Sequence, residues 1–152
     1  MANFLDKIIE DKKESLKQIK KTNSLDSLEN TIKSLNIFLN FKDAILNNKD
    51  VSLITEIKKA SPSAGELVKD FNHLNIAKMY VDNSATCLSV LTEEKHFLGK
   101  LDYIRDIKNR FKIPVLAKDF FIDPYQKSHL RTHRPYSSVQ FTFTCNFSGK
   151  EK

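Results

Sequence analysis

The 152-residue chain contains no tryptophan, two cysteines, three glycines and four prolines. Cys87 and Cys145 are too few and too far apart to predict a disulfide framework. No apolar run reaches the roughly 18 residues expected of a membrane-spanning helix, so we expect no membrane partner. Residues 1–7 lack a basic segment followed by an apolar one. This argues against a secretory signal and favours a cytoplasmic location.

Signatures of several enzyme classes are also missing. Neither a Walker motif nor a Ser-His-Asp arrangement is readable in the sequence. His129 and His133 have the spacing of the second half of a zinc finger, but no cysteine pair precedes them. Because a structural zinc site needs that pair, we expect no metal site.

The positive charge is concentrated at one end of the chain. Of the net charge of +6, residues 127–152 carry +4, with five Lys or Arg and one Glu. The remainder is nearly balanced, and nothing interleaves aromatic with basic residues as an RNA-binding sheet does. We therefore expect no nucleic-acid partner. The alternative is binding through the basic tail, with an affinity that falls steeply as salt rises.

The apolar share of 40% and charged share of 29% indicate a folded, globular chain. It is too short for a complete (β/α)8 barrel, which needs roughly 200–250 residues. Helical spacing of apolar residues predicts a helix over residues 3–20, with Asn3 as N-cap, and one or two further helical pieces over residues 24–46. Residues 1–50 therefore read as a helical N-terminal extension.

The pattern then changes to short apolar runs separated by helical segments. The predicted strands are Val51–Ile57, Cys87–Leu91 and Ile113–Ala117, and the predicted helices between them are Asp70–Tyr80 and Leu98–Phe111. Strands that alternate with helices indicate βαβ units, hence an α/β fold with a parallel sheet. Asp123-Pro124 is a helix start, but no convincing apolar stripe follows it.

Two lysines stand at the ends of predicted strands. Lys58 follows the first strand and shares a strand face with Glu56, while Lys118 follows the third and shares a face with Leu116. Such a lysine can act as a general acid, as an anchor for a carboxylate or phosphate, or as a Schiff-base nucleophile. The alternative is a lysine that merely extends into solvent. The residues alone leave both interpretations open.

Two loops follow these strands. One, residues 61–65, carries hydroxyls and backbone N–H groups suited to a phosphate or carboxylate, although Ser/Pro/Gly loops are common. The other, residues 92–95, follows the second strand, and taken alone it is more typical of a loop that leads into a helix. Both are candidates to line one opening with the lysines.

Three segments together resemble the indole-3-glycerol phosphate synthase family, an enzyme family with a (β/α)8-barrel fold. They are Ile54-Thr55-Glu56-Ile57-Lys58-Lys59-Ala60-Ser61-Pro62-Ser63-Ala64-Gly65, Leu88-Ser89-Val90-Leu91-Thr92-Glu93 and Pro114-Val115-Leu116-Ala117-Lys118-Asp119-Phe120. The resemblance implies a fragment of a TIM barrel, with residues 51–126 supplying its first three strands. It also implies a lyase of tryptophan biosynthesis that closes the indole ring of a carboxyphenylamino-deoxyribulose phosphate with loss of CO2 and water.

The resemblance assigns roles to particular residues and implies no cofactor or metal. Lys118 is expected to be the general acid, Lys58 to bind the substrate carboxylate, and Glu56 to pair with it and accept a proton. The expected substrate contacts, around a phosphorylated small molecule, are Ser61, Ser63, Leu91, Phe97 and Phe120.

The resemblance ends near Gln126, and residues 127–152 read as an unmatched, irregular tail. A frameshifted, truncated or misassembled reading frame is the expectation for such an abrupt change of composition. Strands 4 to 8 of the barrel, with further catalytic residues and phosphate loops, are not readable. We therefore expect no synthase activity from this chain alone. The alternative is a non-enzymatic half-barrel that pairs with a complementary fragment.

Overall fold

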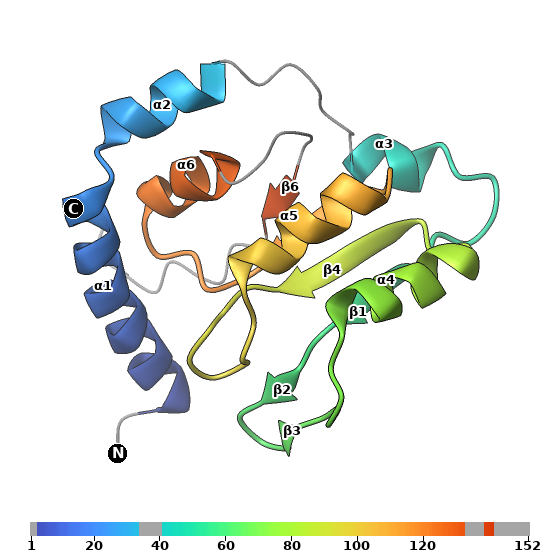
Figure 1. The fold of residues 1–152 in the computed structure, drawn as a ribbon, viewed down its shortest axis with the longest axis horizontal. Coiled ribbons are helices and arrows are strands. Elements are labelled where there is room, and N and C mark those ends of the chain that lie inside the picture. Colours follow the sequence, from blue (N-terminus) through green and yellow to red (C-terminus); the bar gives the residue numbers. More distant parts are fainter. Residues whose placement is uncertain (1–2, 34–40, 133–138, 142–152) are drawn as a thin grey trace, which may run out of the picture.

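A sheet of parallel strands forms the centre of the protein in its computed structural model, which describes residues 3–33, 41–132 and 139–141. The strands of this sheet, in spatial order, are β1 (Ile54–Ile57), β4 (Cys87–Leu91), β5 (Val115–Lys118) and β6 (Val139–Phe141). The helices are α1 (Phe4–Thr22), α2 (Leu25–Lys33), α3 (Phe41–Leu46), α4 (His73–Asp82), α5 (Leu101–Arg110) and α6 (Pro124–Thr132). A short antiparallel hairpin, β2 (Ala60–Ser61) with β3 (Gly65–Glu66), follows β1. Figure 1 shows this arrangement.

The two faces of the sheet differ in burial because successive side chains of a strand point to opposite sides. One face packs under α4 and α5 and forms the main core. Its fully buried side chains are Ile57, Ala77, Leu88, Val90, Ile104, Ile107, Val115 and Ala117. The other face, which would be the inside of a barrel, carries Ile54 and Glu56 from β1 and is partly exposed, with Ile54 45% accessible.

Local sequence explains where the helices begin. The Asp6 carboxylate accepts a hydrogen bond from the backbone N–H of Asn3 at 3.0 Å, closing the first turn of α1. The Asn72 side chain accepts bonds from the N–H groups of Leu74 and Asn75, both at 3.0 Å, and so caps α4. These caps satisfy backbone donors that have no partner inside the helix.

The predicted α/β fragment with three parallel strands is confirmed, and the helices expected in residues 3–20 and 24–46 are present as α1, α2 and α3. The first strand is shorter than predicted. It begins at Ile54, after the Leu53 carbonyl accepts bonds from the N–H groups of Thr86 (2.9 Å) and Cys87 (3.2 Å). Val51 lies before this pairing and is 92% exposed.

The expectation of an irregular segment over residues 127–152 is wrong for residues 127–132 and 139–141, whereas the remainder of that segment lies outside the described residues. Helix α6 continues to Thr132, and β6 pairs in parallel with β5, so a helix and a fourth strand follow β5. The helix buries Tyr125, Gln126 and Leu130. The apolar stripe of α6 is hard to recognise in the sequence because one of its buried positions is the polar Gln126. The side-chain amide of Gln126 accepts a hydrogen bond from the Ile122 N–H at 2.7 Å and donates one to the Phe120 carbonyl at 2.9 Å.

Helix α1 lies at the end of the sheet to which the arrowhead of β4 points (Figure 1). A second apolar cluster of Leu16, Leu28 and Tyr125 joins α1 and α2 to α6. Helices α1 and α2 are thereby held against α6. Within the described residues, no helix is both long and apolar enough to cross a membrane.

Candidate active site

The carboxyl end of the sheet brings the two strand-end lysines together around one carboxylate. Glu56 Oε1 lies 2.7 Å from the ammonium of Lys58, and Glu56 Oε2 accepts a hydrogen bond from the ammonium of Lys118. The three side chains are between 28% and 48% exposed, so the cluster faces solvent on the open side of the sheet. The structure therefore brings both strand-end lysines to the same carboxylate.

Strand register explains the meeting. Glu56 pairs with Ser89, and Ser89 pairs with Leu116, so these three lie in one row on the inner face. Two residues further along, Leu91 pairs with Lys118 and forms the next row. Side chains of alternate strands share layers inside a barrel, and here β1 and β5 meet across β4 in the same way.

Electrostatics fix the charge of the cluster. Burial acts to raise the pKa of Glu56, but hydrogen bonds from Lys118 and Lys58, together with their charges, outweigh it and hold this pKa below its usual value. Glu56 is therefore an anion at neutral pH and screens the two ammonium groups from each other. The arrangement can hold two cations side by side until a substrate anion replaces part of that pairing.

Two aromatic rings stand near the lysines. Phe97, from the loop between β4 and α5, and Phe120, from the loop after β5, have ring centroids 6.1 Å apart with planes tilted by 40°. The Phe97 carbonyl also accepts the Ala60 N–H at 3.2 Å, which ties this loop to the β2–β3 hairpin. The rings offer an apolar wall of the kind that positions a planar group.

The remaining predicted contacts are placed less uniformly. Ser61 lies in β2, where its hydroxyl accepts the N–H of Ala64 at 3.2 Å and shapes the hairpin. Ser63 is exposed at the hairpin turn. Leu91 is only 4% exposed and lies in the same row of the sheet as Lys118. Of the two histidines with zinc-finger spacing, His129 lies in α6, whereas His133 falls outside the described residues.

A buried carboxylate, Glu93, organises the loop that carries Phe97. The sequence pattern identifies residues 92–95 only as a loop and gives Glu93 no role. Glu93 is 3% exposed and accepts the backbone N–H groups of Lys95 (3.2 Å), His96 (2.7 Å) and Phe97 (3.0 Å). Gly99 fits against this loop because a Cβ there would lie 2.4 Å from the Leu91 carbonyl oxygen. The position of Phe97 is thus determined by its own loop.

Ion pairs that the sequence pattern does not predict join α1 to the loops after β4 and β5. Asp11 contacts Lys95 Nζ at 2.5 Å and His96 Nε2 at 2.9 Å. Lys12 pairs with Asp119 at 2.6 Å. These bonds join residues about a hundred positions apart, and no local sequence pattern announces such partners. The pKa of Asp11 is lowered mainly by its hydrogen bond with Lys95 and secondly by its hydrogen bond with His96.

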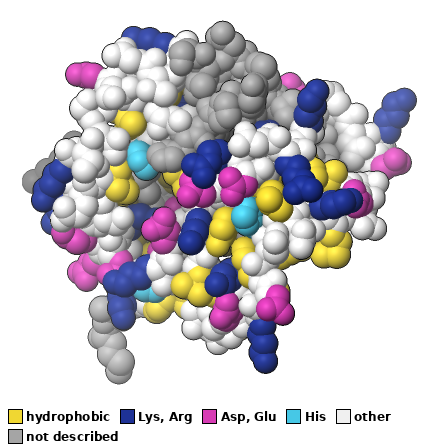
Figure 2. All heavy atoms as spheres, in the orientation of Figure 1, with side chains coloured by type: hydrophobic (Ala, Val, Ile, Leu, Met, Phe, Trp, Pro, Cys, Tyr) yellow, Lys and Arg dark blue, Asp and Glu magenta, His cyan; other side chains and the backbone are white. Residues whose placement is uncertain are grey.

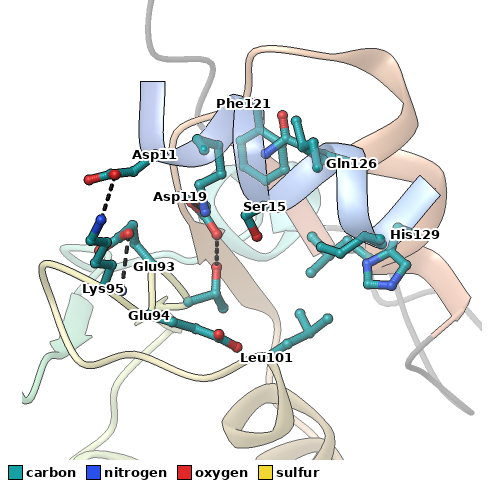
Figure 3. Close-up of a pocket in the computed structure, with 15 residues that line it drawn as sticks. Asp11, Ser15, Glu93, Glu94, Lys95, Leu101, Asp119, Phe121, Gln126 and His129 are labelled. Carbon is teal, nitrogen blue, oxygen red and sulfur yellow. Dashed lines mark hydrogen bonds and ion pairs between the residues drawn. The ribbon is translucent and has the colours of Figure 1, made fainter. Parts of the chain in front are cut away.

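A cavity of about 320 Å³ lies between α1, the loop after β4, the loop after β5 and α6 (Figure 3). Its wall includes Ser15, Glu94, Asp119 and His129, but not Glu56 or the strand-end lysines. The cavity is on the α1 side of the strand ends, whereas the lysine cluster is on the open inner face of the sheet.

Comparison with known proteins agrees with this geometry. A sequence profile described as indole-3-glycerol phosphate synthase matches residues 5–134, which extends past Gln126, where the sequence resemblance was expected to end. An indole-3-glycerol phosphate synthase of Desulforamulus reducens is 45% identical over 123 residues, 81% of this chain and 46% of that protein. One from Clostridium acetobutylicum is 46% identical over 124 residues, 81% of this chain and 47% of that protein.

A third synthase, from Alkaliphilus metalliredigens, is 44% identical over 123 residues, which are again 81% of this chain and 47% of the relative. The chain therefore spans about half the length of the curated relatives it matches. The parallel strands with intervening helices fit the first part of a (β/α)8 barrel. On the extent of these matches, the chain belongs to the indole-3-glycerol phosphate synthase family.

Proposed function

We propose that this chain supplies the first half of an active site that converts a carboxyphenylamino-deoxyribulose phosphate into indole-3-glycerol phosphate, CO2 and water. The observation that supports the proposal most is the pairing of Glu56 with both Lys58 and Lys118 at the carboxyl ends of β1 and β5. In barrel enzymes, catalytic groups stand at this end of the strands. The synthase names of the relatives agree with the same reaction.

In the proposed mechanism, Lys118 is the general acid. Its ammonium donates a proton to the ribulose carbonyl oxygen as the aromatic carbon attacks, so that no free alkoxide forms. Lys58 binds the carboxylate of the substrate, which later leaves as CO2. Glu56 holds both ammonium groups in place before the substrate arrives. In the closing dehydration, Glu56 as an anion accepts a proton from the substrate, and the Lys58 ammonium donates a proton to the hydroxyl group, which leaves as water.

The substrate ring lies against Phe97 and Phe120 in this proposal, with Leu91 as the floor between the two lysines. Ser61 and Ser63 contact the substrate from the β2–β3 hairpin, which Ala60 N–H links to the loop of Phe97. The substrate is thus a phosphorylated small molecule with an aromatic acid at one end. No cofactor is needed, because the lysines and Glu56 supply every proton transfer the proposal contains.

The same proposal makes the chain incomplete by itself. Residues 51–126 act as the first part of a barrel, residues 1–50 as its helical extension, and the relatives are about twice as long. A second candidate follows: the chain is a half-barrel that becomes active only with a complementary chain. In its favour, β1 pairs with β4 alone among the described strands, and Leu53 and Ile54 beside that edge are 48% and 45% exposed.

We extend the proposal to the cytoplasm, a reducing compartment, in keeping with the free and buried thiol of Cys87. Binding of nucleic acid is disfavoured by the distribution of charge. On the face shown in Figure 2, Lys and Arg side chains are interspersed with Asp and Glu rather than gathered in one basic stripe.

The test is turnover of the purified chain, alone and mixed with the part of the Clostridium acetobutylicum relative that follows its matched segment. Indole fluorescence reports product, and size-exclusion chromatography reports whether the two chains associate. We expect association and product formation in the mixture, and no product from the chain alone. A complex that forms without any turnover contradicts the proposed reaction, and full turnover by the chain alone contradicts its incompleteness.

A further inference from the structure

Asp119 stands between the two residues proposed to contact substrate after β5, Lys118 and Phe120, but its side chain is directed the other way. Figure 3 shows it among the residues under α1. Its Oδ1 lies 2.6 Å from Lys12 Nζ and accepts the backbone N–H of Phe120 at 2.7 Å. Its Oδ2 accepts the hydroxyl of Thr92 at 2.9 Å. One carboxylate therefore joins a helix, a neighbouring strand end and its own loop.

Thr92 completes the connection to the lysine. Its backbone N–H donates to the Lys118 carbonyl at 3.0 Å, one residue beyond the pairing of Leu91 with Lys118 in the sheet. The main chain on both sides of Asp119 is thus bonded, at Lys118 through Thr92 and at Phe120 through Asp119 itself. A rigid main chain here sets the directions in which the Lys118 ammonium and the Phe120 ring leave the sheet.

Burial distinguishes this ion pair from the Lys20–Asp123 bridge of the same helix. The side chains of Lys12 and Asp119 are 15% and 13% exposed. The pair Lys20–Asp123, also at 2.6 Å and also between α1 and the segment after β5, is 44% and 32% exposed. Water screens the second pair more than the first, and loss of one partner from a shielded pair leaves the other charge poorly solvated.

We propose that Asp119 is a positioning residue, which uses Lys12 of α1 and Thr92 to fix the orientation of Lys118 and Phe120. Helix α1 then helps to orient the residues of the site, in addition to packing against the core. The inference depends on the proposed function for the statement that Lys118 and Phe120 meet the substrate. The geometric statement, that Asp119 controls their orientation, can be tested without turnover.

The test uses the full chain labelled with fluorophenylalanine, with the Phe120 resonance assigned by its absence in Phe120→Leu. Asp119→Asn and Lys12→Met should each shift and broaden that resonance. Asp123→Asn is the matched control, since it removes a bridge of equal length from the same helix, and it should leave the Phe120 resonance in place. Circular dichroism confirms that each variant is folded.

An unchanged Phe120 resonance in folded Asp119→Asn overturns the proposal. A shift of the same size in Asp123→Asn also overturns it, because it would mean that loss of any bridge from α1 disturbs Phe120. If Asp119→Asn fails to fold, Lys12→Met decides by the same criteria. In the reconstituted two-chain enzyme, Asp119→Asn should lower kcat about 10- to 100-fold, the range expected from a small misplacement of a catalytic group. A fluorine response without any turnover in the wild type would refute the proposed function and leave the positioning role standing.

Discussion

The carboxylate of Glu56 and the ammonium of Lys118 form an ion pair although the residues are 62 positions apart and their strands are separated by β4. Both side chains project from the same face of the sheet, Glu56 from the row of Ser89 and Lys118 from the next row, which contains Leu91. Lys58 binds the other oxygen of the same carboxylate. This shared carboxylate turns two isolated strand ends into one candidate site.

The pairing predicts a specific dependence of stability on pH. Because the pKa of Glu56 is lowered in the folded protein, the stability this group contributes is present above its ordinary pKa of 4.5 and is lost as pH falls through the folded pKa. Glu56→Gln should lower the free energy of unfolding at pH 7 by up to about 1 kcal/mol, the usual range for partly exposed pairs.

Urea unfolding of wild type and Glu56→Gln between pH 3 and pH 7 measures this difference. The two stabilities should converge at the acid end of the range and separate as Glu56 ionises. A difference that stays constant across the range would show that the carboxylate gains nothing from the lysines.

The loop that carries Phe97 should depend strongly on the buried Glu93. Glu93→Ala leaves three backbone N–H groups without their acceptor, and we expect it to cost roughly 2 kcal/mol or more of stability. Glu94→Ala, at the exposed neighbouring position, is the control and should cost less than about 0.5 kcal/mol. Equal urea midpoints for the two variants would contradict the role given to Glu93.

Gly99 should tolerate no side chain. An added Cβ would lie 2.4 Å from the oxygen and 2.7 Å from the carbon of the Leu91 carbonyl, both of them backbone atoms that cannot rotate away. Gly99→Ala should therefore cost roughly 1–3 kcal/mol and alter the near-ultraviolet signal of the loop aromatics.

Gly65→Ala provides the comparison for this effect, because Gly65 has open space around its Cβ position but a φ of +66°. Its cost should come from backbone conformation alone, about 1–2 kcal/mol, with the near-ultraviolet signal of the core preserved. Wild-type stability in Gly99→Ala would show that the loop can move away from Leu91.

Much of the site follows from strand periodicity. The alternation in β1 and β5 puts Glu56, Lys58 and Lys118 on one face, and parallel strands bring their carboxyl ends to one edge, so their convergence is predictable. The three predicted strands are apolar runs, but the first and third were placed too early: β1 begins at Ile54 rather than Val51, and β5 begins at Val115 rather than Ile113. Val51 has the side chain of a strand residue, yet it is 92% exposed and precedes the pairing of β1 with β4.

Other features depend on contacts that periodicity does not encode. The start of helix α6 at Asp123-Pro124 was predicted, but its continuation to Thr132 was not, because the buried Gln126 is stabilised by hydrogen bonds rather than by an apolar side chain. The sequence pattern does not distinguish Asp119 from an ordinary loop residue, because its partner Lys12 lies far away in the sequence, in α1. Ser89 is buried in the row between Glu56 and Leu116, a location set by strand order alone.

The central claim, that Lys118 is the acid of a synthase half-site, is tested most directly by turnover of the reconstituted two-chain enzyme with Lys118→Met. Lys59→Met is the matched control, since Lys59 pairs with Glu66 on the hairpin at 3.1 Å and is outside the proposed machinery. The account predicts a fall in kcat of at least about 100-fold for Lys118→Met, as loss of a general acid implies, and near wild-type turnover for Lys59→Met. Undiminished turnover in Lys118→Met would contradict it.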